Sequence, residues 1–498
     1  MKIHSVQTMR AAEQALFDSG RCDSASLMDA AVEACLAQLA RHPLFARAAQ
    51  MFSCVVVYAG KGKNAGDALG IARGLGIDSI LVRAAVAADE LAADSRRMLA
   101  GSGCVQFVEL EDLPVPGSER LLIIDGLLGS GASGSLRPAY AALVREMNAL
   151  RAAHSGSMTL AVDIPTGLQP DIGVTHEPVT VADATLAIGC VKPGMLADGA
   201  EDYVGRLLCV PLPAVSLPDS AAQVADSCVA ALLPRRSFSC FKNRAGRVRI
   251  VAGSPGYTGA ARLCAEAALA AGAGLIELCC LPSIYPILAA STAPEIMVRP
   301  IGSMAEVQAE GADALLIGPG LGTPPEADAL RSLAESAPCP VVLDADALNL
   351  IAARGWQPGP HTILTPHPGE MRRLHPAAAQ MSRAECVADF LRCHPCTLLL
   401  KGARSIIASP HATYYNSTGG PHMANGGQGD ALAGVVAAFA AQGLSPLHAA
   451  LLGAYACGHA ADIAQARSGH ALAVHATQLF PYLTSLDTYL PTTQTAHP

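Results

Sequence analysis

Short apolar runs alternate with helical stretches along the whole chain. An amphipathic helical stretch spans about 5–40, and an unbroken apolar run follows it at 52–60 (FSCVVVYAG). A glycine-rich turn comes next, and then a helix is predicted over 68–76. Apolar runs flanked by helices are typical of parallel strands covered on both faces. Further strands of this kind are predicted at 79–86, 120–129, 158–165 and 184–189.

A proline-rich segment at 210–223 interrupts this pattern, which then starts again. The chain from Gly429 onward is largely helical in character. We therefore expect two tandem α/β domains, at 1–222 and 223–498. In the second domain strands are predicted at 247–254, 275–281, 314–322, 340–349, 362–370 and 397–403.

Glycines and polar residues gather directly after the predicted strands. In the first half these segments read GKGKNAGDA, DGLLGSGASG and DIPTGL, and in the second GPGLG, DADALN, TPHPGE and LKGARS. Open parallel sheets bind ligands beyond the carboxyl ends of their strands. The pattern therefore predicts two ligand sites, one in each half.

Composition and charge restrict the classes of ligand and the location. The 498 residues carry a formal net charge of −8, so no basic field favours nucleic acid or anionic lipid. No apolar run approaches the roughly 20 residues of a membrane span, and the amino-terminal stretch lacks the layout of a signal peptide. The 16 cysteines are scattered through apolar segments, which favours buried reduced thiols. We expect a soluble, cytoplasmic protein that binds neither nucleic acid nor membrane.

One carboxylate stands out in the segment 422–443 (HMANGGQGDALAGVVAAFAAQG). Asp430 follows three glycines, Gly426, Gly427 and Gly429, and begins a long apolar run. An acid in the first helical turn is favoured by the helix dipole, so Asp430 is explained equally well as a cap. Exposed backbone N–H groups at a helix start also bind anions, and an adjacent carboxylate then suits phosphoryl transfer. These residues alone do not separate the two explanations.

The second half resembles the ADP-dependent NAD(P)H-hydrate dehydratases, which have a ribokinase-like α/β fold. The resemblance covers about 235–490 and rests on an ordered set of motifs. They are GRVRIVAGSPGYTGAARLCAEAALAAGAGLIEL (246–278), LLIGPGLG (315–322), VVLDADALNL (341–350), ILTPHPGEMRRL (363–374), LLLKGARSIIA (398–408) and MANGGQGDALAG (423–434).

The resemblance implies a kinase-like reaction in which the ring hydroxyl of the hydrate is phosphorylated before it leaves. ADP would be the phosphoryl donor, giving AMP and phosphate with Mg²⁺ present, and Asp430 would accept the hydroxyl proton. The hydrate would contact Ala260, Gly322, His367 and Asp430. The nucleotide would contact Lys401, Gly402, Ala403, Arg404, Ser405 and Gly429.

Plainer explanations exist for several of these residues. Lys401 is also explained as a surface lysine, His367 as a turn histidine bonded to backbone, and Gly322 as a turn glycine. The DADALN segment is either a strand-to-helix cap or a support for magnesium and phosphate through Asp344 and Asn349. Gln428 stands where the family usually has Ser or Thr, which adds bulk at the anion site.

The first half resembles the NAD(P)H-hydrate epimerase domain, a Rossmann-like parallel α/β sandwich. The motifs are GKGKNAGDALGIAR, IIDGLLGSGASG, AVDIPTGL and AIGCVKPGM. GKGKNAG also fits a loose dinucleotide fingerprint, but the next strand offers Arg83 where an acid is wanted for a ribose. We therefore favour the epimerase over a hydride-transfer domain.

The epimerase resemblance implies a potassium site and a substrate site. Potassium would be bound by Asn64, Asp125 and Thr166, whose oxygens suit a hard cation. Asp163 and Lys192 would be the acid–base pair. The substrate would also contact the two loops made of Lys63, Asn64, Ala65, Gly66 and Asp67, and of Gly129, Ser130, Gly131, Ala132, Ser133, Gly134 and Ser135.

The first loop departs from the family's N-N-G-G-D-G pattern at Lys63, Ala65 and Ala68. The ammonium of Lys63 would lie near either the cation or the substrate phosphates, and the two methyl groups add bulk beside the backbone. Asp163 is alternatively a helix-capping acid and Lys192 a solvent lysine.

Taken together, the chain resembles the bifunctional NAD(P)H-hydrate repair enzymes of bacteria. The expected ligands are NAD(P)H hydrates and ADP, and a homo-oligomer is expected. Two alternatives stay open: a dehydratase with a degenerate, non-catalytic amino-terminal domain, and an ATP-dependent small-molecule kinase of the ribokinase-like fold.

Overall fold

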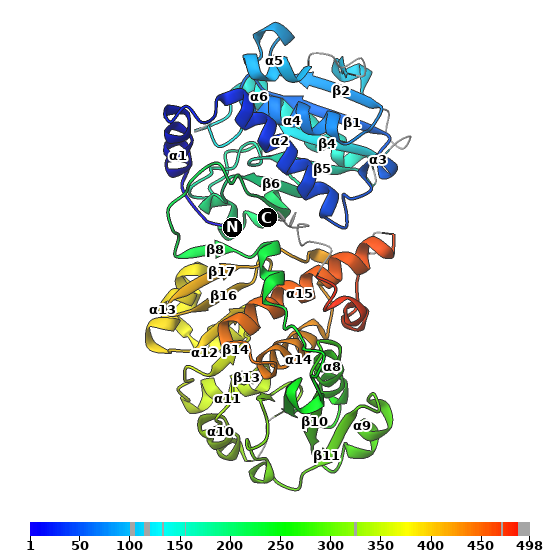
Figure 1. The fold of residues 1–498 in the computed structure, drawn as a ribbon, viewed down its shortest axis with the longest axis vertical. Helices are drawn as coiled ribbons and strands as arrows, with labels where there is room; N and C mark the ends of the chain where they lie inside the picture. Colours follow the sequence, from blue (N-terminus) through cyan, green and yellow to red (C-terminus); the bar gives the residue numbers. More distant parts are fainter. Residues whose placement is uncertain are drawn as a thin grey trace. The chain divides into compact units, whose positions relative to one another are not determined.

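The computed structural model describes residues 1–99, 105–113, 120–131, 134–154, 156–322, 326–469 and 472–486. The chain divides into two compact units, Met1–Val224 and Ala225–Pro498 (Figure 1). This division lies close to the expected boundary at 222–223. No helix in the described ranges is both long and apolar enough to cross a bilayer.

The first unit is built on a parallel sheet with the strand order β3-β2-β1-β4-β5-β6-β7. The order reverses between β1 and β4, and a crevice opens at such a point beyond the carboxyl ends of the strands. β1 and β4 are buried along their whole length, as their continuous apolar runs predict. The strands are β1 (Cys54–Ala59), β2 (Ser79–Ala84), β3 (Val105–Phe107), β4 (Leu121–Gly126), β5 (Met158–Val162), β6 (Ala184–Ile188) and β7 (Arg206–Val210).

Two helices, α1 and α2, occupy the stretch that the sequence pattern predicts as helical at 5–40. Ser5 and Asp23 cap them by accepting hydrogen bonds from the backbone N–H groups of Thr8 and Ser26. The helices of this unit are α1 (Val6–Asp18), α2 (Ser24–Arg41), α3 (Ala48–Met51), α4 (Lys63–Gly74), α5 (Ala93–Leu99), α6 (Pro138–Ala153) and α7 (Glu201–Val204). The short strand β8 (Ala222–Val224) ends the unit.

The sheet of the second unit runs in the order β11-β10-β9-β12-β13-β14-β15-β16-β17. The strands from β11 to β15 are parallel. Strand β16 pairs antiparallel with both β15 and β17. The strands are β9 (Arg247–Val251), β10 (Leu275–Cys280), β11 (Ile296–Pro300), β12 (Ala314–Ile317), β13 (Val341–Leu343), β14 (Thr362–Leu364), β15 (Thr397–Leu400), β16 (Ile406–Ser409) and β17 (Ala412–Tyr415).

Helix α14 lies in the centre of the second unit and is buried from Ala431 to Ala441. It packs closely on α8 because Gly434 has no side chain: a Cβ there would lie 2.0 Å from the carbonyl oxygen of Cys264. The helices of this unit are α8 (Thr258–Ala270), α9 (Tyr285–Ser291), α10 (Ala327–Ser336), α11 (Asp346–Arg354), α12 (Pro368–Leu374), α13 (Arg383–Cys393), α14 (Gln428–Ala441), α15 (Pro446–Arg467) and α16 (Ala476–Leu479). Both units thus have the α/β architecture that the sequence predicts.

Candidate active sites

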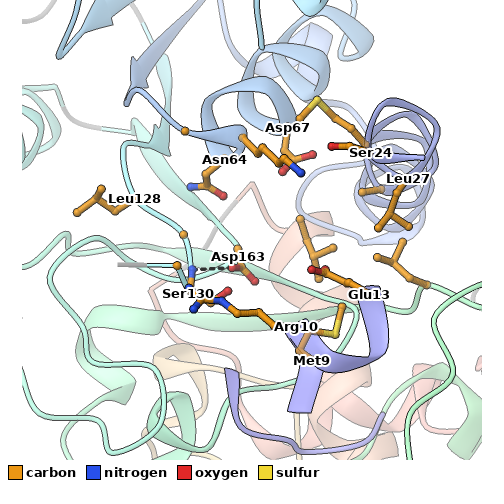
Figure 2. A pocket seen from close by; sticks show the side chains of 18 of the residues that line it. Met9, Arg10, Glu13, Ser24, Leu27, Asn64, Asp67, Leu128, Ser130 and Asp163 are labelled. Atoms are coloured by element: carbon orange, nitrogen blue, oxygen red, sulfur yellow. Dashed lines mark hydrogen bonds between the residues drawn. The ribbon is translucent and has the colours of Figure 1, made fainter. Parts of the chain in front are cut away.

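A cavity of about 440 Å³ lies at the carboxyl ends of β1 and β4 in the first unit (Figure 2). Its floor holds the loops that follow these strands, including Asn64 and Gly129, and the pair Asp163 and Lys192. Helices α1 and α2 form a wall of the cavity. The residues lining that wall are Met9, Arg10, Glu13, Phe17, Ser24, Leu27, Met28 and Ala31.

Asp163 and Lys192 form a buried ion pair at this cavity. The Lys192 ammonium donates to Asp163 Oδ1 and, over 3.0 Å, to the carbonyl oxygen of Ile188. The Lys192 side chain is only 1% exposed, so it is not the solvent lysine of the plainer explanation. The second carboxylate oxygen of Asp163 accepts a 2.8 Å hydrogen bond from the N–H of Ser130. Both groups are therefore held in fixed orientations beside the cavity.

Burial alone would raise the pKa of Asp163, but the Lys192 ammonium and the hydrogen bonds from Lys192 and Ser130 outweigh it and lower that pKa. Burial would likewise lower the pKa of Lys192, and the Asp163 carboxylate outweighs it and raises that pKa. The pair is therefore ionised at neutral pH. Asp163 has a positive φ of 67°, which is uncommon for a residue other than glycine and is often found at functional sites.

Residues 63–67, expected as a loop, form the start of α4, and three of the five contribute to the cavity. Lys63, Asn64 and Asp67 line it, and the Lys63 ammonium lies 5.8 Å from the ring centre of Phe17. Ala65 is fully buried, and a Cβ on Gly66 would lie 2.7 Å from the Met28 sulfur. The side-chain positions of Ala65 and Gly66 therefore face neighbouring helices rather than the cavity.

Asp125 and Thr166 are joined by direct contacts, and the side chain of Asn64 lies beside the loop that follows β4. The Thr166 hydroxyl donates to Asp125 Oδ1 and its N–H to Asp125 Oδ2, both over 2.8 Å. Burial raises the pKa of Asp125 in spite of these bonds. The Asn64 side chain lies toward Gly129, where a Cβ would come within 3.2 Å of Asn64 Oδ1 and of Asp163 Oδ2.

The glycine-rich loop after β4 is only partly at the cavity. Gly129, Ser130 and Gly131 line it, whereas Gly134 and Ser135 are exposed and do not. Ala132 and Ser133 lie outside the described residues. A Cβ on Gly131 would lie 3.3 Å from the guanidinium of Arg10, so this loop approaches α1 closely.

In the second unit the candidate site lies where β12 to β15 end. Asp430 occupies the first turn of α14, which begins after Gly427 at a φ of 88°. Burial, and then the nearby carboxylate of Asp344, raise the pKa of Asp430 to about 6, although Lys401 opposes the shift. A carboxylate with such a pKa is ionised at neutral pH and basic enough to accept a proton.

Lys401 connects the ends of three neighbouring strands. Its ammonium lies 2.7 Å from Asp344 Oδ1 and 3.9 Å from Glu370 Oε2, and its side chain is 18% exposed. The buried Asp344 carboxylate also accepts a 2.8 Å hydrogen bond from Thr365. A Cβ on Gly429 would lie 3.4 Å from the same ammonium, so Lys401 stands beside the start of α14. It is not a plain surface lysine.

Gly322 and His367 lie near this group, with Ala260 on a neighbouring helix. The N–H of Gly322 donates over 2.8 Å to Asp346, the acid that also raises the pKa of Asp430. His367 caps α12: its Nδ1 accepts from the N–H of Gly369 over 2.9 Å, which is the plainer of its two explanations. Ala260 lies in the first turn of α8, where its Cβ would be 3.0 Å from a Cβ on Gly320.

The residues Gly402, Ala403, Arg404 and Ser405 form the turn between β15 and β16. Arg404 has a φ of 53°, and Arg383 donates to the carbonyl oxygen of Ala403 over 2.8 Å. Ser405 Oγ accepts from the N–H of Gly402 over 3.3 Å. This turn directly follows Lys401, at the same edge of the sheet.

The extra bulk of Gln428 suggested that its side chain would crowd the anion site, but the side chain lies elsewhere. Its side-chain amide donates over 2.8 Å to the carbonyl oxygen of Val474 and over 3.2 Å to Asn425 Oδ1. The side chain is thus tied to the segment at 474. We therefore expect little steric effect of Gln428 on an anion bound at the start of α14.

Asp344 and Asn349 are not brought together as a pair. Asp344 is engaged by Lys401 and Thr365, whereas Asn349 donates to Asp346 and accepts from Arg373. The carboxylates that act on Asp430 are Asp344 and Asp346. Among the described residues, no three or more His, Cys, Asp or Glu side chains are grouped to hold a metal ion.

Comparison with known proteins gives matches along most of the chain. Residues 248–485 match a family described as NAD(P)H-hydrate dehydratase, and residues 24–194 match the YjeF-related protein N-terminus. The chain is 36% identical over 456 residues to the bifunctional NAD(P)H-hydrate repair enzyme of Moorella thermoacetica, which covers 83% of this chain and 84% of that protein. The corresponding enzyme of Escherichia coli is 34% identical over 445 residues, covering 86% and 84%.

A solved structure also aligns with the second half of the chain. The ADP/ATP-dependent NAD(P)H-hydrate dehydratase from Bacillus subtilis, co-crystallised with ATP and Mg²⁺, is 28% identical with a TM-score of 0.48. The alignment covers 54% of this chain and 99% of that chain.

Proposed function

Because this chain belongs to the family of bifunctional NAD(P)H-hydrate repair enzymes, we propose that it repairs hydrated nicotinamide nucleotides in two steps. The first unit interconverts the R and S epimers of NAD(P)H hydrate. The second dehydrates the S epimer to NAD(P)H, converting ADP to AMP and phosphate. Membership of this family favours both activities over a small-molecule kinase or a non-catalytic first domain.

The observation that carries this proposal is a buried carboxylate–lysine pair at the carboxyl edge of each sheet. Asp163 pairs with Lys192 in the first unit and Asp344 with Lys401 in the second. Ligand sites of parallel sheets lie at this edge. In each pair the charged groups are held in place before a substrate binds. Such preorganised groups stabilise the charge that develops in the transition state.

In the first unit we assign to Asp163 a proton transfer with the hydroxyl oxygen on the epimerised carbon, with Lys192 keeping the Asp163 carboxylate ionised. Ser130 fixes the carboxylate by its N–H, and the absence of a side chain at Gly129 leaves room for Asn64 and Asp163. The backbone of Gly129 and Gly131 lines the cavity, and its N–H groups suit a pyrophosphate.

The residues beside the cavity also fit a potassium ion. Asp125 is fully buried, and its partners are the neutral groups of Thr166 and the Leu127 N–H. The side-chain oxygen of Asn64 lies beside Gly129, in the loop that follows Asp125. A buried carboxylate without a cationic partner is costly, and a hard cation would offset its charge. We propose that Asp125, Thr166 and Asn64 hold it; the ion would order the loops after β1 and β4.

In the second unit Asp430 accepts the proton of the hydrate hydroxyl as this oxygen attacks the terminal phosphorus of the nucleotide. The N–H groups at the start of α14 and the Lys401 ammonium stabilise the transferred phosphoryl group. The turn of Gly402 to Ser405 lies beside Lys401 and suits the rest of the nucleotide. Magnesium would be bound with the nucleotide phosphates and would neutralise part of their charge, and Asp344 and Asp346 are the carboxylates nearest Asp430 that could assist in holding it. Gly322, Ala260 and His367 would contact the hydrate.

Separate assays of the two steps test this function. Purified S epimer with ADP and Mg²⁺ should regain the absorbance of the dihydronicotinamide, and purified R epimer without nucleotide should convert to an R–S mixture. A phosphate ester that accumulates as a stable product instead would indicate a small-molecule kinase.

Lys401→Ala should weaken binding of ADP more than binding of the hydrate. The variant removes the cation beside Gly429 and leaves the buried Asp344 carboxylate unpaired. Titration of each ligand against the variant measures the effect, with Lys242→Ala as the control because Lys242 is an exposed lysine of the same unit. Equal weakening of both ligands, or of neither, contradicts the assignment.

Lys63→Asn should alter substrate affinity but not the potassium dependence of epimerisation. The Lys63 ammonium lies over the Phe17 ring and lines the cavity, whereas Asp125 and Thr166 are not among the residues that line it. Adding Ala65→Gly and Ala68→Gly should lower stability by about 1 kcal/mol for each glycine, because both alanines are fully buried in α4. Epimerisation rates with and without potassium check the first part and urea unfolding the second. A rise in potassium response in Lys63→Asn would show that the ammonium opposes the ion.

A further inference from the structure

Helix α1 presents one side to the cavity through residues at helical spacing. Met9, Glu13 and Phe17 are four residues apart, so they lie along one stripe of the helix, and all three line the cavity. The Glu13 side chain is half-buried, and it forms no hydrogen bond or ion pair within the described parts of the chain. Figure 2 shows Glu13 on the α1 side of the cavity and Asp163 on the loop that follows β5. Neither the family motifs nor the expected site residues include Glu13.

We propose that Glu13 is the proton-transfer group for the face of the hydrated ring opposite the Asp163–Lys192 pair. This inference rests on the epimerase activity proposed for the first unit. It gives that reaction two proton-transfer groups on separate elements of the fold, one on α1 and one after β5.

Inversion at a hydroxyl-bearing carbon next to a ring nitrogen requires chemistry on both faces. The C–O bond breaks as the nitrogen lone pair forms a C=N bond, and an acid protonates the departing oxygen, which leaves as water. A water molecule then adds to the opposite face, the electron pair returns to nitrogen, and a base takes the surplus proton. The hydrate has the same composition before and after, so no oxidant or reductant is needed. One acid and one base on opposite faces are therefore the minimum set.

The charges around the cavity favour Glu13 as the acid and Asp163 as the base. Burial raises the pKa of Glu13, and the Asp163 carboxylate adds to the shift, while Lys192, Lys63 and Arg10 oppose it. The pKa of Asp163 is lowered, as described above. After one inversion Asp163 holds the proton that Glu13 has lost. Because the pKa of Glu13 is raised and that of Asp163 is lowered, the proton returns to Glu13 through solvent. In the reverse reaction the two groups exchange roles.

Asp67 faces the same cavity but suits a different role. Burial, and then the carboxylates of Asp163 and Glu13, raise the pKa of Asp67 to about 8. Asp67 therefore keeps its proton at neutral pH and can donate a hydrogen bond to the substrate. Asp67 lies on α4, three residues from Asn64, whereas Glu13 reaches the cavity from α1.

The decisive comparison is Glu13→Gln against Gln14→Ala in the full-length protein, using purified R epimer without nucleotide. Glu13→Gln should lower kcat for epimerisation by about 10²-fold or more with KM within a few-fold, because the amide keeps the shape and loses the proton. Glu13→Asp should restore part of the rate. Uptake of ¹⁸O from labelled water into the hydroxyl should fall in parallel. Gln14 is exposed and bonds only to Asp18 among the described residues, so Gln14→Ala should behave as wild type.

Several outcomes would overturn the inference. A Glu13→Gln variant with an altered KM and an unchanged kcat would make Glu13 a residue that positions the substrate. A fully active Glu13→Gln variant with an inactive Asp67→Asn variant would assign the proton transfer to Asp67. If the wild-type protein and Gln14→Ala also fail to interconvert the epimers, the epimerase function itself fails, which is distinguishable from loss confined to Glu13→Gln. Dehydratase activity of each variant reports that the chain is folded.

Discussion

Asp430→Asn should lower the rate of hydrate dehydration by about 10²-fold or more while ADP affinity stays within a few-fold of wild type. The substitution removes the proton acceptor at the start of α14 and retains the backbone N–H groups that face the phosphates. Steady-state rates with purified S epimer and direct titration of ADP separate the two effects. A turnover close to that of wild type would show that Asp430 is only a helix cap.

The pH dependence of dehydration tests the same assignment. Asp430 must be ionised to accept a proton, and its pKa is raised to about 6 by burial and by Asp344. The rate should therefore fall as pH drops through about 6, and this fall should be absent from the residual activity of Asp430→Asn.

Asp328→Asn is the matched control for Asp430. Asp328 is an exposed acid in the first turn of α10, as Asp430 is in the first turn of α14. Loss of a favourable dipole interaction there costs roughly 0.3–1 kcal/mol and should leave the rate unchanged. Equal loss of activity in both variants would point to destabilisation of helices rather than to loss of a base.

Lys192→Met and Asp163→Asn should each abolish epimerisation and also destabilise the first unit by about 3–5 kcal/mol. The pair is buried, so removing one partner leaves the charge of the other without compensation. Epimer interconversion and urea unfolding measure the two effects. Dehydration of S epimer by the second unit should persist in both variants.

The exposed pair of Arg97 and Asp29 provides a comparison for this result. These side chains are 42% and 55% exposed, and an ion pair of this kind contributes about 0–1 kcal/mol. Asp29→Asn should therefore leave both stability and epimerisation nearly unchanged. If Lys192→Met retains the epimerase rate, the Asp163–Lys192 pair only maintains the fold.

The apolar runs of the chain were sufficient to predict both parallel sheets. β1, β4 and β12 are buried on both faces, and such strands read as continuous apolar segments. The edge strands β3 and β11 were not predicted because they are largely exposed. Strand β7 was not predicted because its apolar run at 206–210 lies beside a proline-rich segment. The hairpin of β16 and β17 was missed because its strands are short and have no helix between them.

The candidate sites were predictable where residues follow a strand, because parallel strands bring their carboxyl ends to one edge. Asp163 and Lys401 belong to this class, whereas Asp430 was predicted from the glycines that precede its helix. Glu13 and Arg10 were not predicted because they reach the cavity from α1, a helix far away in sequence whose packing leaves no local motif. The hydrogen bond from Gln428 to the carbonyl oxygen of Val474, 46 residues away along the chain, is not revealed by the position of Gln428 in a motif. Residue type and spacing locate a site, but helix packing decides which side chains face it.

The central claim is that one chain performs both epimerisation and dehydration. An equal mixture of R and S NADH hydrate, incubated with the protein, ADP, Mg²⁺ and potassium and followed to completion, tests it most directly. We predict that the S epimer disappears first and the R epimer follows at a rate proportional to enzyme concentration, until all of the hydrate is recovered as NADH. Recovery that stops when the S epimer is exhausted, with the R epimer remaining at its uncatalysed rate of conversion, would contradict the account.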